Sequence, residues 1–275
     1  MKCIDFDKYL GQYIEKYIIE HRDENLDIDE VEARMPEIYM RWLNTPADWL
    51  DGCAPGAWFQ QYDDVDQLIE GIKEYHRARI LPPDLLLERI TAFGEAAAEG
   101  LMAVAADAKA DVGTRITALN MLGDIGTACP MELCLEIISS AAEQDGLSET
   151  ASELLINMGR RVVEPALARM EGASAIAREA LLDVLCNFPG DERIYKYAMH
   201  AFRTQPERRA LYASYLSKLR DPRAIEPLKR ALTLTELNYL DYIEIVNAIE
   251  ALGGEVEMTR EFAGDPYYES LKKMD

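Results

Sequence analysis

The sequence of 275 residues predicts an all-α fold, a right-handed α-α superhelix of stacked helix pairs. One helical pattern recurs six times between Leu85 and Gly254, with a mean spacing of about 32 residues. Within a copy, apolar residues recur every three or four positions, which is the spacing of one helix face. We expect about five full helix pairs from residue 95 to 254. Residues 85–94 should complete a junction to the N-terminal helices.

Each copy ends on a helix that carries small and large apolar residues and often a terminal glycine. The six segments are 85–94, 114–123, 150–159, 177–186, 211–220 and 244–253. Asp221 is a candidate N-cap, followed by Pro222 in the first turn, where a missing N–H costs nothing. Gly123, Gly159 and Gly253 are predicted to end helices, because glycine tolerates positive φ.

Two stretches resemble a known repeat family. Residues 221–232 read Asp-Pro-Arg-Ala-Ile-Glu-Pro-Leu-Lys-Arg-Ala-Leu, and residues 115–123 read Arg-Ile-Thr-Ala-Leu-Asn-Met-Leu-Gly. Both are similar to the short HEAT-like repeats of the phycobilisome-lyase type, over roughly residues 82–254, and we interpret the chain as a bacterial HEAT-like solenoid. Such stacks serve as adaptors and as enzymes, so the resemblance implies the fold and leaves the function open.

The repeats divide the chain into three predicted regions. Residues 1–81 form a non-repeat helical region with an aromatic corner, residues 82–254 form the repeats, and residues 255–275 form a C-terminal cap. The last helix is expected to start at Asp265-Pro266, where it would cover the apolar end of the sixth copy.

The N-terminal region begins with two expected helices, at 6–21 and 29–43. Pro36 lies inside the second helix and is expected to kink or divide it. Thr45 followed by Pro46 has the pattern of a helix start. A further helix is expected at 64–76.

All three tryptophans, Trp42, Trp49 and Trp58, fall within seventeen residues of this region. They form either a buried cap on the first repeat, since solenoid ends need atypical caps, or an exposed docking surface. Residues 42–72 also resemble the toxin-pairing C-terminal segment of bacterial antitoxins of the MbcA/ParS kind. Leucine, proline and glycine at this spacing also suit any corner between two helices.

The chain is strongly acidic, with a formal net charge of −21 that repels nucleic acid phosphates. The charge is uneven, because residues 160–230 hold 14 basic and 9 acidic residues. If the second helix of each pair lines a concave face, Arg115, Arg178, Arg208 and Arg209 would offer guanidinium groups to a carboxylate or phosphate. Ala151 interrupts this row, and the alternative is ordinary solvated surface.

Composition suggests a cytoplasmic protein that binds no membrane, metal or cofactor. No run of eighteen apolar residues is present, and charges occupy the first residues, where a signal peptide needs apolar ones. The five cysteines contain no Cys-x-x-Cys pair and suit a reducing compartment; they are Cys3, Cys53, Cys129, Cys134 and Cys186. The three histidines, at positions 21, 76 and 200, are followed by Arg, Arg and Ala.

These observations predict a non-enzymatic scaffold that binds a protein or peptide through its concave face, its aromatic corner or both. The alternative is an enzyme, or an enzyme subunit, of the bilin-lyase-like HEAT type. HEAT-like iron-dependent hydroxylases use His-Glu ligand pairs, which this chain lacks. HEAT-like DNA glycosylases need a basic DNA-lining surface, which the overall charge opposes.

Overall fold

The computed structural model describes residues 1–21, 28–126, 130–257 and 260–271. Over these ranges the chain is all-helical and contains no strand. It forms two compact units, Met1–Pro130 (unit 1) and Met131–Asp275 (unit 2), so the boundary falls inside the predicted repeats. Among the described helices, none combines the length and the apolar character that a membrane crossing needs.

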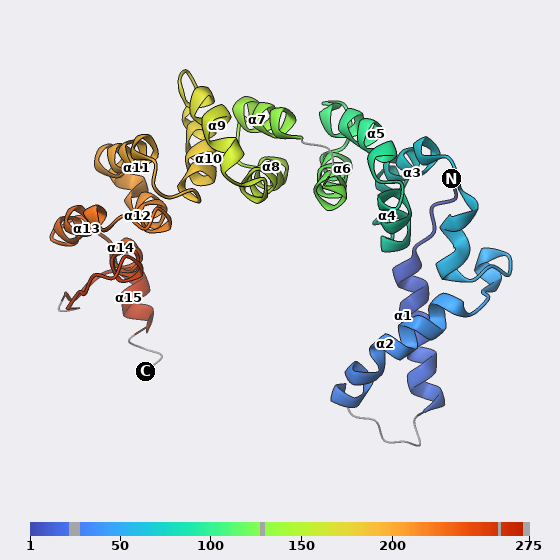
Figure 1. Cartoon of the computed structure of the whole chain (residues 1–275). Helices are drawn as coiled ribbons and strands as arrows, with labels where there is room; N and C mark the ends of the chain where they lie inside the picture. The colour runs from blue at the N-terminus through green and yellow to red at the C-terminus, as the bar shows by residue number, and fades with distance from the viewer. Residues whose placement is uncertain (22–27, 127–129, 258–259, 272–275) are drawn as a thin grey trace. The chain divides into compact units, whose positions relative to one another are not determined.

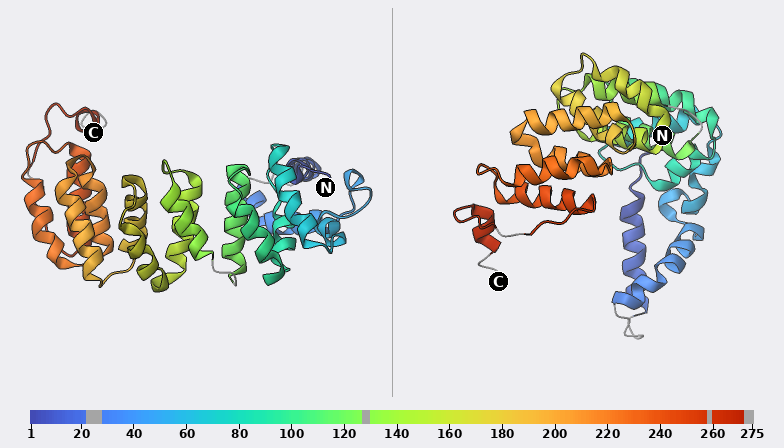
Figure 2. Two further views of the ribbon diagram at one scale, coloured as in Figure 1. Left: turned by 90° about the horizontal axis from the view of Figure 1, so that it is seen from above. Right: turned by 60° about the vertical axis from the view of Figure 1, so that its left-hand side comes forward.

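Unit 1 consists of α-helices and two short 3-10 helices (Figure 1). They are α1 (Phe6–Glu20), α2 (Ile28–Asn44), η2 (Asp48–Leu50), η3 (Pro55–Gln61), α3 (Val65–Arg77), α4 (Asp84–Thr91), α5 (Glu95–Ala106) and α6 (Val112–Ile125). Helix α1 lies beside α2 (Figure 2, right), α5 packs on α6, and α3 contacts α4, α5 and α6. The fully buried side chains of Leu68, Leu86 and Leu119 belong to this core.

Unit 2 is a series of helix pairs in two layers (Figures 1 and 2). Its elements are α7 (Met131–Ser140), α8 (Gly146–Asn157), η4 (Gly159–Val162), α9 (Val163–Met170), α10 (Ala175–Cys186), α11 (Glu192–Thr204), η5 (Pro206–Arg208), α12 (Arg209–Lys218), η6 (Pro222–Ala224), α13 (Ile225–Leu232), α14 (Tyr239–Ala251) and α15 (Pro266–Leu271). Each of α7, α9, α11 and α13 pairs with the following helix, and α8, α10, α12 and α14 contact one another in turn.

Side-chain caps explain where these helices begin. Asp145 accepts a hydrogen bond from the backbone N–H of Ser148, whose hydroxyl is bonded in return to the Asp145 backbone, which makes a capping box at α8. Ser174 and Asn238 cap α10 and α14. The cap predicted at Asp221 is confirmed, although the element it opens is η6, a 3-10 turn that leads into α13.

The six predicted segments all fall on helices, namely α4, α6, α8, α10, α12 and α14. Gly159 and Gly253 have φ of 75° and 83°, as predicted for helix ends. The prediction for Gly123 is wrong, because α6 continues to Ile125 and Gly126 has the positive φ. Arg220 ends the fifth segment at φ 53°, a left-handed conformation that costs a residue with a side chain about 1–2 kcal/mol.

Two predictions for the N-terminal helices concern Pro36 and Thr45. Pro36 lies inside α2 and does not divide it. Thr45 does not open a helix, because its hydroxyl donates to the Arg41 carbonyl (2.7 Å) in the last turn of α2. Instead η2 starts at Asp48 without a side-chain cap. The helix expected at 64–76 is confirmed as α3, which Asp64 caps.

The C-terminal residues pack onto α14. Asp265 accepts hydrogen bonds from the backbone N–H groups of Tyr267 (3.0 Å) and Tyr268 (3.1 Å), so the predicted helix start is confirmed as that of α15. Phe262 is buried in a cluster with Tyr242 and Val246 of α14. Residues 258–259 and 272–275 of the predicted cap lie outside the described residues.

Candidate functional site

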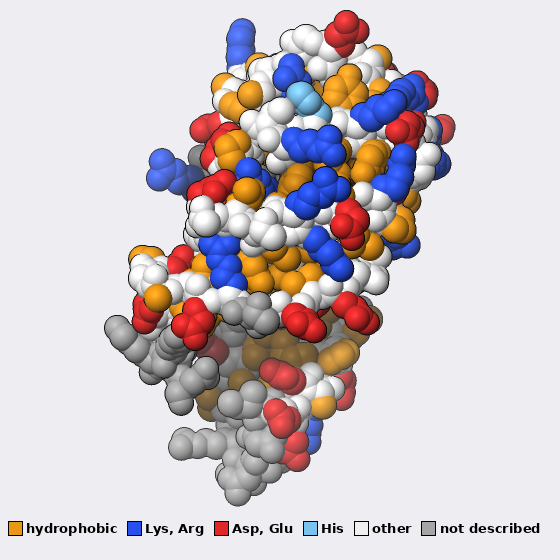
Figure 3. Space-filling model, turned by 90° about the vertical axis from the view of Figure 1, so that its left-hand side faces the viewer, with side chains coloured by type: hydrophobic (Ala, Val, Ile, Leu, Met, Phe, Trp, Pro, Cys, Tyr) orange, Lys and Arg blue, Asp and Glu red, His pale blue; other side chains and the backbone are white. Residues whose placement is uncertain are grey.

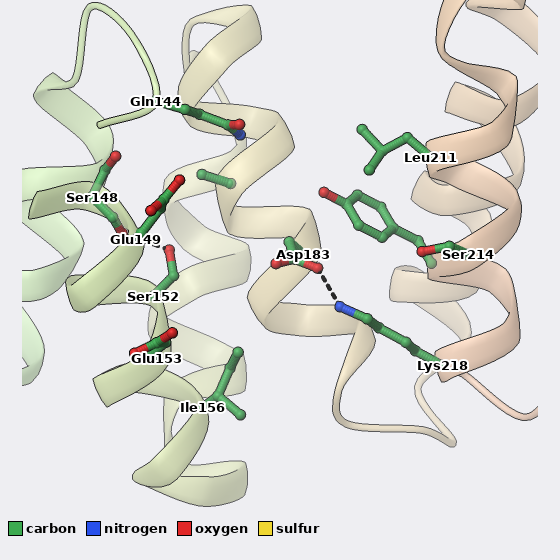
Figure 4. A pocket seen from close by; sticks show the side chains of 12 residues that line it. Gln144, Ser148, Glu149, Ser152, Glu153, Ile156, Asp183, Leu211, Ser214 and Lys218 are labelled. Carbon is green, nitrogen blue, oxygen red and sulfur yellow. Dashed lines mark hydrogen bonds and ion pairs between the residues drawn. The ribbon is translucent and has the colours of Figure 1, made fainter. Parts of the chain in front are cut away.

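A groove in unit 2 runs over α8, α10 and α12 (Figure 4). Each of these is the second helix of its pair, and we call them the second helices. The groove encloses about 400 Å³. Its lining residues are Gln144, Ser148, Glu149, Ser152, Glu153, Ile156, Ala180, Asp183, Leu211, Ser214, Tyr215 and Lys218. Both walls follow from helix periodicity: 149, 152, 153 and 156 share one face of α8, and 211, 214, 215 and 218 share one face of α12.

The charged side chains give the groove a negative balance. Lys218 is paired with Asp183 (Nζ to Oδ1, 2.6 Å). Glu149 and Glu153 are exposed, line the groove and have no ion-pair partner among the described residues. Because they are four residues apart on α8, their mutual repulsion costs about 0.2–0.5 kcal/mol. The wall on α8 therefore presents two unpaired carboxylates to the groove.

Tyr215 brings a hydroxyl to the groove from a side chain that is otherwise buried. Its side chain is only 5% exposed, and its hydroxyl makes no hydrogen bond to any residue of the described ranges. Burial, with the nearby carboxylate of Asp183, raises the pKa of Tyr215. The phenol therefore stays protonated, with one donor and its acceptor lone pairs available.

A polar cluster lies beside the Gln144 end of the groove. Glu179 of α10, 8% exposed, accepts a hydrogen bond from the Gln144 amide (3.2 Å) and forms an ion pair with Arg208. Burial raises the pKa of Glu179, and the charge of Arg208 opposes that shift only in part. This cluster joins the α7–α8 loop, α10 and η5.

The raised pKa makes a testable prediction for Glu179. A carboxyl that binds its proton more tightly in the folded state stabilises the fold below its ordinary pKa of 4.5, and this contribution is lost as the pH rises through the folded-state pKa. Glu179→Gln removes that loss. The free energy of unfolding of the variant minus that of the original chain should therefore increase as the pH rises from about 4 to about 7. Denaturant titrations of both proteins at each pH measure this difference. A relative decrease would mean that Arg208 outweighs burial.

None of the four predicted arginines lines the groove. Arg115 belongs to unit 1, where its Nε donates to the Ala105 carbonyl (2.9 Å). In unit 2, Arg178 donates to the Ala173 carbonyl (2.9 Å), Arg208 pairs with Glu179, and Arg209 starts α12 half-buried. Each of the first three therefore has a partner close by in its own unit.

The basic middle of the sequence is partly neutralised by ion pairs between successive helix pairs. Arg193 of α11 contacts Glu164 of α9 (2.5 Å), and Arg223 of η6 contacts Glu192 of α11 (2.8 Å). Figure 3 shows Lys and Arg side chains spread among hydrophobic and acidic ones on one face of the molecule. Because these pairs are exposed to solvent, water and salt screen them, and each adds little to stability.

The aromatic corner of unit 1 is buried on one side and open on the other. Trp42 is 5% exposed, whereas Trp49 and Trp58 are half-buried. Trp49 stacks on Tyr9 with ring centroids 4.1 Å apart, and both line a hollow of about 320 Å³. The Nε1 of Trp58 is buried without a hydrogen-bond partner in the described structure.

Two titratable side chains outside the groove, His76 and Cys186, have pKa values that are shifted by burial. His76 contacts the Thr117 hydroxyl (3.1 Å), and burial lowers its pKa. Burial raises the pKa of the Cys186 thiol, which keeps it protonated. Cys129 lies outside the described residues. Within the described ranges, no group of three or more His, Cys, Asp or Glu side chains is placed to hold a metal ion.

No family model matches the sequence. No curated protein matches it either. The groove therefore rests on its own geometry. Sequence reasoning missed it, although polar residues recur at three- and four-residue spacing on α8, opposite the apolar face of that helix. That second, polar stripe was the available signal.

Proposed function

We propose that this chain is a non-enzymatic interaction scaffold whose unit 2 binds a segment of a protein partner, as a HEAT-like solenoid of the phycobilisome-lyase type. The two layers of unit 2 support the architecture, because α8, α10, α12 and α14 contact one another in turn while each also packs on the helix that precedes it. Stacked helix pairs of this kind present extended binding surfaces.

One observation supports the function, the groove over α8, α10 and α12. It is open along its length, and it is lined by hydroxyl, carboxylate and apolar side chains from three successive second helices. An extended segment offers backbone N–H and C=O groups to such a lining, and it needs no deep cavity. The enzymatic alternative, a bilin-lyase-like activity, has no comparable observation in the described residues.

A site-specific crosslink tests this proposal. A photo-crosslinking amino acid is placed in the full chain at Ser152 or Ser214 in the groove, and at Ala168 or Tyr197 on the other helix layer as a control. We expect the groove positions to capture one partner segment from source-cell extract, identified by mass spectrometry.

The captured segment is then synthesised and bound to the purified chain. Ser214→Trp, which fills the groove, should lower its affinity at least tenfold, whereas Ala168→Trp should not. Equal crosslinking at the groove and control positions, or equal binding by the two tryptophan variants, would refute the scaffold proposal for this face.

A further inference from the structure

We infer that the groove takes an extended segment with lysine or arginine at alternate positions, separated by small or apolar residues. This inference rests on the proposed function, which it makes more specific. The partner is thereby defined by its chemistry as a basic peptide segment.

The spacing of the two unpaired carboxylates sets the register. Glu149 and Glu153 are four residues apart on one face of α8, hence about 6 Å apart along the helix axis. Alternate side chains of an extended chain are separated by about 6.6 Å and point to the same side. A basic-x-basic segment that runs along α8 therefore places one cation at each glutamate.

The intervening residues of such a segment point to the opposite wall. There α12 presents Leu211 and Ser214, which suit small or apolar side chains (Figure 4). The floor is formed by Ala180 and Asp183 of α10. Because Lys218 is held by Asp183, its charge does not cancel that of the two glutamates.

Tyr215 supplies an independent observation that favours a polar ligand in the groove. The Tyr215 side chain is 5% exposed, yet its hydroxyl has no hydrogen-bond partner among the described residues and is not fully enclosed, so it faces the groove with its donor free. It lines the groove between Leu211 and Lys218. The backbone of a bound segment offers the missing partner.

The test uses the full chain and synthetic nonapeptides labelled with fluorescein. The probe has lysine at every second position, with serine and leucine between; one comparison peptide groups the same lysines together, and another replaces them with glutamine. Binding is measured by fluorescence anisotropy at 0.15 M salt, because a chain of charge −21 attracts any cation at low salt. We expect the alternating peptide to bind most tightly.

Matched variants separate the groove from the overall charge. The double variant Glu149→Gln/Glu153→Gln should weaken binding of the alternating peptide about tenfold or more, since two charge-assisted contacts are lost. Glu171→Gln/Glu226→Gln changes the net charge equally at exposed positions outside the groove, and should alter binding less than twofold. Tyr215→Phe should weaken it roughly 2- to 10-fold.

Equal losses for the two double variants, or no preference for the alternating peptide, would overturn the inference. The proposed function would survive that result if a crosslinked segment without alternating basic residues still required an open groove. If neither the peptides nor a crosslinked segment depends on Ser214→Trp, both proposals fail together.

Discussion

Replacing Trp42 with alanine is expected to lower the free energy of unfolding by roughly 3–5 kcal/mol. Its ring is 5% exposed and lies in the aromatic corner, edge-to-face with Phe6 (6.4 Å between centroids) and stacked with Tyr39 (5.7 Å). Removing it leaves a cavity among α1, α2 and η3 that rigid helices cannot close. Denaturant unfolding followed by circular dichroism measures the loss.

Trp49→Ala is the matched control in the same corner. Its ring is half-buried and stacks on Tyr9, so solvent already covers part of the surface that the deletion would expose. We expect a loss of roughly 1–2 kcal/mol. If Trp49→Ala costs as much as Trp42→Ala, the corner is a closed cap. A loss below about 1 kcal/mol for Trp42 would contradict its placement in the core.

Helix periodicity predicted the all-helical character of the described residues and the positions of many helices, because it reports directly which side chains are buried. All six repeat segments lie on helices, and Asp221 and Asp265 begin elements as expected. The helix start predicted at Thr45 was wrong because a threonine hydroxyl can donate to the carbonyl four residues earlier as readily as it can cap a following helix. Here it donates to the Arg41 carbonyl. The helix end predicted at Gly123 was wrong because a helix tolerates an internal glycine, and Gly126 ends α6 instead.

The candidate site was less predictable than the fold, since it depends on which side chains find partners. Arg208 was predicted to offer its guanidinium group to a ligand, yet it pairs with Glu179 of α10. Glu149 and Glu153, which were not among the predicted site residues, line the groove and have no ion-pair partner among the described residues. Such pairings join residues about thirty positions apart, and no local pattern encodes them.

Replacing Leu185 with alanine should lower the free energy of unfolding by roughly 2–5 kcal/mol, and several neighbouring helix pairs should lose stability together. Leu185 is fully buried in α10, and this helix contacts α7, α8, α9, α11 and α12. In a stack stabilised by neighbours, a defect at such a central helix weakens the coupling of the pairs on both sides. Hydrogen exchange measured by mass spectrometry should show faster exchange from α7 through α12.

Leu228→Ala tests whether position in the stack decides the outcome. Leu228 is also fully buried, but it belongs to α13, whose main contacts are with η6 and α14. The deletion removes the same atoms, so the local cost is similar, while the loss of protection should stay within α12 to α14. If both variants accelerated exchange uniformly across unit 2, its helices would unfold as one cooperative body. If the faster exchange instead extends further for Leu185→Ala than for Leu228→Ala, each helix pair is stabilised by its neighbours. That coupling between neighbours is what lets a groove extend over three helix pairs.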